Sequence, residues 1–356
     1  MKPNLALKPH SDGFDSDEIV ARLGDEARCL AGKTVLLTGA QGFLGRQFAA
    51  VFERLNAGVL EQPVTVVLLD NFVTGHHGEE PPQRAHARFI KHDVIQPFEW
   101  DAPLDYIVHA AGIASPFHYR ARPMETLEVA ITGTKNMLEL AKAHQARLTF
   151  FSSSEIYGDP DPQHIPIQES YRGNVSCRGP RACYDEGKRV GETLCYVYHE
   201  YYGTHTNTIR PFNIYGPGMP EFDYRVLPNF ASCIKAGRPL QVYGRGSQTR
   251  TFCYLTDAMV GFLKVILNGV PGEAYNIGNP EPEVTVLELV AAITEALGRP
   301  VEHVVTDYPD SYPADEPMRR CPDIRKARTQ LDFEPLVDLN EGLGRFLAWT
   351  DKHYAG

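Results

Sequence analysis

The chain has 356 residues, of which 43% are hydrophobic and 22% charged, and its formal net charge is −10. This composition predicts a globular protein with a large core, in one big domain or two smaller ones, and excludes a disordered chain. The negative charge argues against a nucleic-acid partner. No run approaches the ~18 apolar residues of a membrane span, and the N-terminal segment lacks the apolar core of a secretion signal. We therefore expect no membrane attachment.

Seven cysteines without a C-x-x-C pair argue against a disulfide framework or a zinc ribbon, so a cytoplasmic location is expected. The pair His76 and His77 lies in the polar stretch "VTGHHGEEPPQRAHAR", where no third ligand completes a pattern. We predict a solvated loop there and no metal site. Cys183 is interpreted as a small buried thiol on a helix and not as a nucleophile.

In chain order, residues 1–32 are predicted to form a polar N-terminal arm with one short helix in "SDEIVARLGDEARCL". From Lys33, "KTVLLTGAQGFLGRQFAAVFERLN" has the pattern of a strand, a tight turn and a helix. Further strands are predicted in "VTVVLLDNF", "DYIVHAAG" and "RLTFFSSSE", and "METLEVAITGTKNMLELAKAH" has helical periodicity. Strands that alternate with helices predict a parallel sheet covered on both faces.

The glycines of "TGAQGFLG" follow the first predicted strand at every third position, as Gly39, Gly42 and Gly45. Without side chains, such a turn lets a pyrophosphate approach the helix N-terminus. Asp70 ends the next strand, where a dinucleotide site needs an acceptor for ribose hydroxyls, and a carboxylate there repels a 2′-phosphate. NAD is therefore predicted in preference to NADP. Asp93 of "HDV" is interpreted either as a cap on the adenine pocket or as an ordinary turn aspartate. The other predicted contacts are Phe43, Leu44, Asn71, Val94, Ala110 and Ala111.

The stretch "GPRACYDEGKR" places Tyr184 and Lys188 four positions apart in a predicted helix, so both can point into one cavity. An ammonium group beside the phenol is expected to lower the pKa of Tyr184 toward working pH. Tyrosine then becomes a usable base. By itself such a pair is often ordinary helix surface, but downstream of a dinucleotide turn it favours a reactive site.

Beyond about residue 215 the alternation loosens into Pro- and Gly-rich segments and short helices such as "TVLELVAAITEALG". The predicted fold class is α/β, a Rossmann-type doubly wound parallel sheet with a smaller C-terminal α/β substrate-binding subdomain. The cofactor-binding domain is expected over residues 33–215, including the Tyr-Lys helix. The subdomain is expected mainly over residues 216–356.

Three motifs, "TGAQGFLG", "SSSEIYGDP" and "YDEGK", resemble those of the extended short-chain dehydrogenase/reductases that act on nucleotide sugars. Among these, "GPRACYDEGKRVGETLCYVYHEYYG", "RPFNIYGPGM", "VYGRGSQTRTFCYLTD" and "YNIGNPEP" are similar to the UDP-glucuronate decarboxylases, also called UDP-xylose synthases. The resemblance runs from about Lys33 to Trp349. It implies tightly bound NAD that is regenerated in each cycle, a UDP-sugar substrate, and a homodimer that pairs the Tyr-Lys helix and its neighbour.

The reaction that this resemblance implies is redox-neutral. Tyr184 would take the proton of the sugar's 4-hydroxyl while hydride passes to NAD, with Lys188 also holding the nicotinamide ribose. The C4 ketone is β to the C6 carboxylate, so loss of carbon dioxide leaves an enolate whose charge the carbonyl spreads. Protonation at C5 and return of the hydride then give UDP-xylose.

The resemblance also implies roles for further residues. Ser153 matches the hydroxyl residue beside the sugar's 4-position, and Ser154 with Glu155 matches the Ser-Glu pair of decarboxylases. Related 4,6-dehydratases carry Asp-Glu there, so Ser154 counts against dehydration. Arg250 matches the arginine that meets the substrate's acidic or phosphate end. Asn213 and Arg225 match nucleotide-diphosphate contacts, and Tyr243 is assigned to the substrate site with them.

One departure from the family pattern concerns the substrate. Decarboxylases commonly read K-T-N where this chain reads "EVA", so Glu128 replaces a lysine expected near the sugar. An inward, ionised Glu128 would repel a glucuronate carboxylate. The function therefore stays open between a decarboxylase, a 4-epimerase or other 4-keto-forming enzyme on another nucleotide sugar, and a non-catalytic sugar-nucleotide binding protein. The third is disfavoured because the Tyr-Lys-hydroxyl set is complete.

Overall fold

The computed structural model describes residues 14–74, 84–221, 223, 225–307 and 317–355. Its centre is a seven-stranded parallel sheet in the order β11-β6-β5-β4-β1-β2-β3. The strands are β1 (Thr34–Thr38), β2 (Thr65–Asp70), β3 (Ala87–Lys91), β4 (Tyr106–His109), β5 (Arg147–Phe151), β6 (Thr206–Pro211) and β11 (Ala274–Ile277). Apolar runs such as "TVLLT" and "TVVLLD" are almost wholly buried, as expected for strands with both faces covered.

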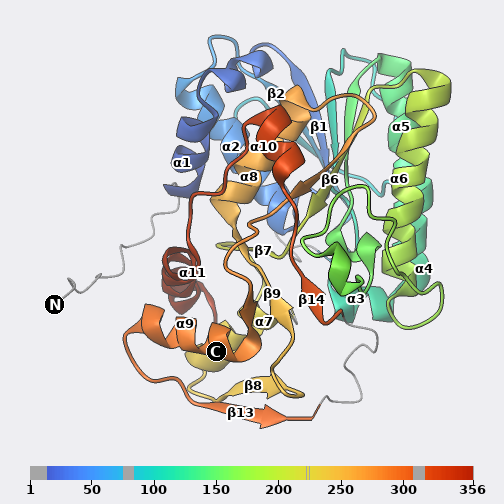
Figure 1. The fold of residues 1–356 in the computed structure, drawn as a ribbon. Helices are drawn as coiled ribbons and strands as arrows, with labels where there is room; N and C mark the ends of the chain where they lie inside the picture. Colours follow the sequence, from blue (N-terminus) through green and yellow to red (C-terminus); the bar gives the residue numbers. More distant parts are fainter. Residues whose placement is uncertain (1–13, 75–83, 222, 224, 308–316, 356) are drawn as a thin grey trace.

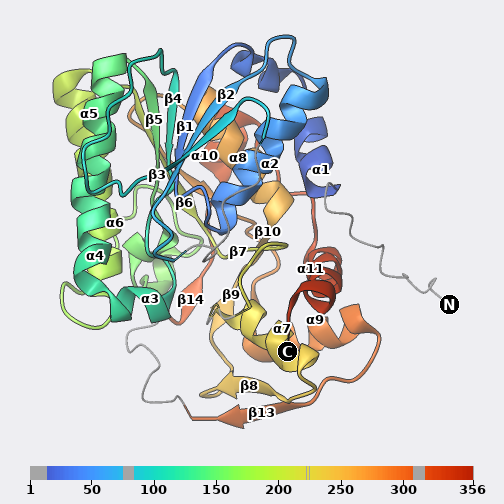
Figure 2. The same ribbon diagram turned by 180° about the vertical axis from the view of Figure 1, so that it is seen from behind.

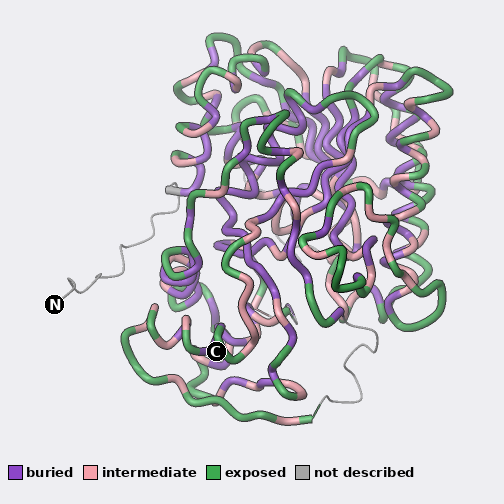
Figure 3. Tube along the Cα trace, viewed as in Figure 1, coloured by how far each residue is buried: buried purple, intermediate pink, exposed green. Residues whose placement is uncertain are grey.

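Helices cover both faces of the sheet, as Figures 1 and 2 show from opposite sides. On one side lie α4 (Pro123–Glu128), the single π-helical turn η2 (Val129–Gly133), α5 (Thr134–His144) and α6 (Ala182–Tyr202). On the other lie α1 (Phe14–Leu23), α2 (Phe43–Gly58), α8 (Leu255–Asn268) and α10 (Arg325–Leu331). Buried positions concentrate in the strands and the inner helix faces (Figure 3). This architecture is the doubly wound α/β fold expected from the alternating pattern.

The C-terminal half forms a smaller unit below one end of the sheet (Figure 1). Its helices are α7 (Val226–Lys235), α9 (Val286–Leu297) and α11 (Leu339–His353). Its strands are β7 (Ile214–Tyr215), β8 (Leu240–Tyr243), β9 (Thr249–Arg250), β10 (Cys253–Tyr254), β12 (Val284–Thr285), β13 (His303–Thr306) and β14 (Arg319–Arg320). A separate apolar cluster, which includes Phe230, Ile293 and Phe346, forms its core.

The chain does not divide at one point, because segments beyond residue 216 return to the large sheet. Helix α8 packs on β5, β6 and β11, and β11 itself pairs with β6 at the edge. Three short elements complete the fold: α3 (Pro116–Ala121) and the 3-10 turns η3 (Ser154–Tyr157) and η4 (Pro162–His164). No helix in the described part of the chain is long and apolar enough to cross a membrane.

Residues 14–30 lie against the fold and do not stand apart as an arm. Helix α1 continues into the 3-10 segment η1 (Gly24–Leu30), and α1 packs on α2 and α8. Ile19 and Leu23 are 0% and 2% exposed, because their spacing puts both on the inner face of α1. Arg22 Nη1 donates to Asp257 Oδ1 of α8 at 2.6 Å. The N-terminal helices are therefore part of the core.

We predict that Leu23→Ala lowers the free energy of unfolding by about 2–5 kcal/mol, because it opens a cavity beneath α1. Chemical denaturation followed by circular dichroism measures this change. Leu336→Ala is the matched control, since Leu336 is 67% exposed and should shift stability little. Equal, small effects from both substitutions would show that α1 contributes no core packing.

Candidate active site

The glycine turn after β1 forms a cradle that side chains would fill. Gly39 has a φ of 70°, and a Cβ there would lie 2.9 Å from the Ala110 carbonyl oxygen and from the Ala111 backbone. A Cβ on Gly45 would lie 2.1 Å from the Gly39 carbonyl oxygen. Gly42 caps α2, whose first residues are Phe43 and Leu44. The cradle and the open helix N-terminus fit the diphosphate of a dinucleotide.

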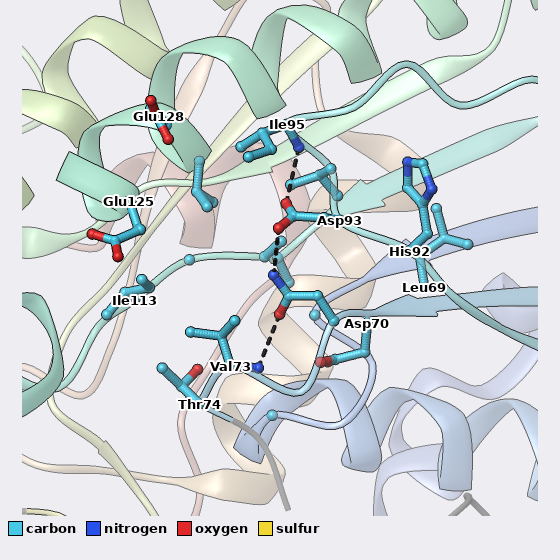
Figure 4. Close-up of a pocket in the computed structure, with 18 residues that line it drawn as sticks. Leu69, Asp70, Val73, Thr74, His92, Asp93, Ile95, Ile113, Glu125 and Glu128 are labelled. Carbon is cyan, nitrogen blue, oxygen red and sulfur yellow. Dashed lines mark hydrogen bonds between the residues drawn. The ribbon is translucent and has the colours of Figure 1, made fainter. Parts of the chain in front are cut away.

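Carboxylates line the pocket beside this turn (Figure 4). Asp70 ends β2 and is 8% exposed, and its two oxygens accept the backbone N–H groups of Gln41 and Phe72 at 2.8 and 2.7 Å. Asn71 Nδ2 donates to Asp93 Oδ2 at 3.0 Å. Other predicted cofactor residues at this pocket are Val94, Ala110 and Ala111. The residues predicted for the ribose and adenine therefore lie together.

Helix α4 contributes Glu125 and Glu128 to this same pocket (Figure 4). Glu125 and Glu128 are both exposed. The lining of this pocket does not include Tyr184 or Ser153. Glu128 was expected beside the sugar, but the structure places it with the residues predicted to hold the cofactor.

Ser153, Tyr184 and Lys188 come together at the carboxyl end of β5. They are 9%, 8% and 7% exposed, respectively. The Ser153 hydroxyl hydrogen-bonds the Tyr184 phenol and also accepts the Glu155 N–H at 3.2 Å. The Lys188 ammonium donates to the Phe151 carbonyl at 2.6 Å and lies 5.8 Å from the centre of the Tyr184 ring. One helical turn of α6 and the end of β5 thus assemble a hydroxyl, a phenol and an ammonium group.

The expected lowering of the Tyr184 pKa is wrong. Burial raises the pKa of Tyr184 to about 12, which outweighs the lowering by the Ser153 hydrogen bond. Burial also lowers the pKa of Lys188 to about 8. The lysine interacts with a carbonyl and not directly with the phenol, so desolvation dominates.

Glu155 lies between two arginines at the start of η3. Arg320 Nη2 donates to Glu155 Oε2 at 2.8 Å and its Nη1 donates to Oε1, while Arg181 Nη2 donates to Oε2. Burial alone would raise the pKa of Glu155, but Arg320 and Arg181 hold it well below its usual range. The carboxylate is therefore ionised. Ser154 is 3% exposed and begins η3.

The predicted substrate residues lie in the C-terminal half. Arg225 Nε donates to Asp223 Oδ1 at 2.9 Å, and its positive charge acts on the Tyr184 phenol. Asn213 has a φ of 44° and donates to the Thr251 carbonyl at 2.8 Å. Arg250 donates to the Pro317 carbonyl at 2.7 Å, and its charge also acts on Glu155. Tyr243 ends β8, which pairs with β13.

Sequence reasoning missed four residues that the structure brings to this site: Arg320, Arg181, Asp185 and Tyr119. Arg320 pairs with Glu155 across 165 positions, which no local pattern indicates. Arg181 stands inside "GPRACYDEGKR", four residues before Asp185, so helical spacing could have identified that pair. Tyr119 stacks on Tyr184 with 5.3 Å between ring centres.

The histidine pair and Cys183 lie apart from this chemistry. His76 and His77 lie outside the described residues. Within the described ranges, no three His, Cys, Asp or Glu side chains are grouped as a metal site would need. Cys183 is half-buried, its thiol lies 3.6 Å from the Tyr119 carbonyl oxygen, and burial raises its pKa. A thiol of that kind is a poor nucleophile.

We predict that Gly45→Ala weakens NAD binding at least about tenfold, because its Cβ would meet the backbone of the glycine turn. NAD released from the denatured protein and titration calorimetry measure the change. Gly58→Ala at the other end of α2 is the control, since the nearest atom to its Cβ is the end of the flexible Arg54 side chain at 3.1 Å. Undiminished NAD in folded Gly45→Ala would exclude this cradle as the binding site.

Comparisons with known proteins show the family of the chain. Residues 35–278 match the NAD dependent epimerase/dehydratase family. UDP-glucuronic acid decarboxylase 1 of Danio rerio is 40% identical over 322 residues, covering 90% of this chain and 73% of its own. UDP-glucuronic acid decarboxylase 6 of Arabidopsis thaliana is 40% identical over 312 residues, covering 87% and 86%.

Solved structures agree on the fold. An epimerase from Methanothermobacter thermautotrophicus superposes with a TM-score of 0.77 at 28% identity, covering 93% of this chain and 95% of its own. A UDP-glucuronic acid 4-epimerase from Bacillus cereus, solved with UDP-glucuronic acid and NAD, has a TM-score of 0.75 at 23% identity, covering 90% and 100%. The glycine cradle, the Asp70 carboxylate and the family match agree, and the chain belongs to the NAD-dependent epimerase/dehydratase family.

Proposed function

We propose that the chain decarboxylates UDP-glucuronate to UDP-xylose through a transient C4 ketone. The observation that carries this proposal is the Ser153–Tyr184–Lys188 group beside a carboxylate held by two arginines. The relatives named UDP-glucuronic acid decarboxylases, at about 40% identity over most of the chain, support the same reaction. NAD, when bound, supplies the acceptor and later the donor of the C4 hydride.

Tyr184 removes the proton from the sugar's C4 hydroxyl and returns it at the end of the cycle. The Ser153 hydroxyl, already hydrogen-bonded to the phenol, donates to the developing C4 oxyanion. Lys188, whose pKa is about 8, keeps its positive charge at neutral pH. Its ammonium group makes no hydrogen bond to the phenol but lies 5.8 Å from the centre of the Tyr184 ring, where its charge attracts the phenolate. These three side chains thus move and hold the proton at one oxygen.

Carbon dioxide leaves when the C5–C6 bond breaks and its electron pair enters the C4 carbonyl as an enolate. A proton added at C5 then completes the exchange of the carboxylate for hydrogen. Glu155 and Arg320 are assigned to this end of the sugar, and Arg225 with Arg250 to the diphosphate. The guanidinium groups of Arg181, Arg320, Arg225 and Arg250 suit a substrate that carries a carboxylate and a diphosphate.

C4 epimerisation is the second candidate, because it needs the same hydroxyl, phenol and ammonium group. Its chemistry has no use for Glu155 held between Arg181 and Arg320. Glu128 lines the pocket beside the glycine turn, whose lining does not include Tyr184 or Ser153, and this weakens the argument that it rejects a glucuronate carboxylate. Decarboxylation is therefore the better-supported outcome.

We predict that Tyr184→Phe lowers kcat for carbon dioxide release from UDP-glucuronate by about 100-fold or more, because the base is lost. Product formation is followed by mass spectrometry, and bound NAD is measured in the same sample. Tyr196→Phe on the same helix is the control, since Tyr196 is 56% exposed. Substantial turnover by Tyr184→Phe with NAD bound would remove Tyr184 from the chemistry.

We further propose a homodimer formed through α6 and its neighbour α5. An apolar stripe on α6 comprises Val190, Leu194, Val197 and Tyr201, spaced so that all four share one helix face. Val190 and Tyr201 are 36% and 74% exposed, and Ile131 of the adjoining η2 is 39% exposed. Two such helix pairs could pack as a four-helix interface.

We predict that the double variant Val197→Glu, Tyr201→Glu sediments as a monomer where the unmodified protein sediments as a dimer, because two carboxylates would be buried without partners. Analytical ultracentrifugation distinguishes the two masses. Leu336→Glu, at a 67% exposed position in the loop before α11, should leave the mass unchanged. A dimer that survives the double substitution would place the interface elsewhere.

A further inference from the structure

A second carboxyl group, that of Asp185, shares Arg181 with Glu155, and neither the sequence motifs nor the proposed reaction assigns it a role. Asp185 follows Tyr184 on α6 and is 6% exposed. Its Oδ2 lies 3.5 Å from Arg181 Nε, and its buried Oδ1 has no hydrogen-bond partner among the described residues. A buried carboxylate oxygen without a donor is costly, whereas a protonated carboxyl group avoids most of that cost.

Arg181 is shared between the two carboxyl groups. Its Nη2 donates to Glu155 Oε2 while its Nε faces Asp185. Arg320 holds Glu155 from the other side with two hydrogen bonds. With Asp185 neutral, Arg181, Arg320 and Glu155 together carry one positive charge; with Asp185 ionised, the four groups carry none.

We propose that Asp185 is a positioning residue that controls the net charge of the Arg181–Glu155–Arg320 cluster, so that the cluster holds an anionic sugar only while Asp185 carries its proton. Ionised Asp185 would compete with Glu155 and the substrate carboxylate for Arg181. This inference rests on the proposed function, because it concerns recognition of a sugar that bears a carboxylate.

The groups that face Asp185 favour its protonated form near neutral pH. Burial and the negative charge of Glu155 raise the pKa of Asp185 to about 7, against the lowering by Arg181 and Arg320. Tyr119 of α3, and Cys183 and Tyr184 of α6, also interact electrostatically with Asp185. Burial raises the pKa of all three groups, so none of them carries charge in the neutral range. Asp185 is thus the member of the group that changes charge in the neutral range.

Equilibrium binding tests the proposal without turnover, in a Tyr184→Phe background that holds NAD. We expect the Kd of UDP-glucuronate to rise about tenfold between about pH 6 and about pH 8, and the Kd of UDP-glucose to stay constant. Asp185→Asn should bind UDP-glucuronate with the low-pH affinity at both pH values. Glu186→Gln, the neighbouring carboxylate that pairs with Arg189, should retain the unmodified pH dependence.

A second readout needs no substrate. Because the folded pKa of Asp185 is raised, the folded state binds more protons than the unfolded state between about pH 4 and about pH 7, and stability falls as pH rises through that window. The thermal midpoint of Asp185→Asn should therefore gain on that of the unmodified protein as pH rises.

The outcomes separate the inference from the proposed function. Tight binding of UDP-glucuronate with no pH dependence, or the same pH dependence in Asp185→Asn, would overturn the role of Asp185 and leave decarboxylation standing. If the protein binds UDP-glucuronate neither at about pH 6 nor at about pH 8, the role of Asp185 and the proposed decarboxylation are both overturned. If binding depends on pH and Asp185→Asn removes that dependence, the inference is supported even when the bound sugar is only epimerised.

Discussion

The common edge at which β1, β2, β4 and β5 end is the constraint on which the site depends. Parallel pairing aligns Thr38 with Leu69 and with His109, so the segments that follow these strands meet. The glycine turn, Asp70, the Ala110–Ala111 segment and Ser153 all lie just beyond this edge. A shift of one residue in strand register would turn these side chains to the other face and separate them.

The sign of the charged side chains differs between the pocket beside the glycine turn and the surroundings of Glu155. On the cofactor side, carboxylates surround a pocket suited to ribose hydroxyls. On the side proposed for the sugar, Arg181 before α6 and Arg320 of β14 surround Glu155 of η3 with guanidinium groups. Desolvation raises the pKa of Tyr184 to about 12 and lowers that of Lys188 to about 8, so both groups are neutral more readily than in water. Charge in this site is thus maintained by specific partners and not by solvent.

The sequence allowed prediction of the sheet, the glycine turn, Asp70 and the Tyr184–Lys188 pair, because each depends on local spacing. It could not locate Arg320, which reaches Glu155 only through the return of the chain after residue 316. It also misjudged the Tyr184 pKa, since burial depends on tertiary packing that no local pattern records. The packing of α1 on α8 was missed for the same reason: charged residues on the outer face made residues 14–30 resemble a polar arm.

The most direct test of the central claim is to incubate the purified protein with UDP-glucuronate in D₂O without added NAD, and to identify the product by mass spectrometry and proton NMR. A C4 ketone and a C5 enolate predict a UDP-pentose that has lost carbon dioxide, gained one deuterium at C5 and kept its original hydrogen at C4. A product of unchanged sugar carbon number, or one that forms only with added NAD in stoichiometric amounts, would contradict the account.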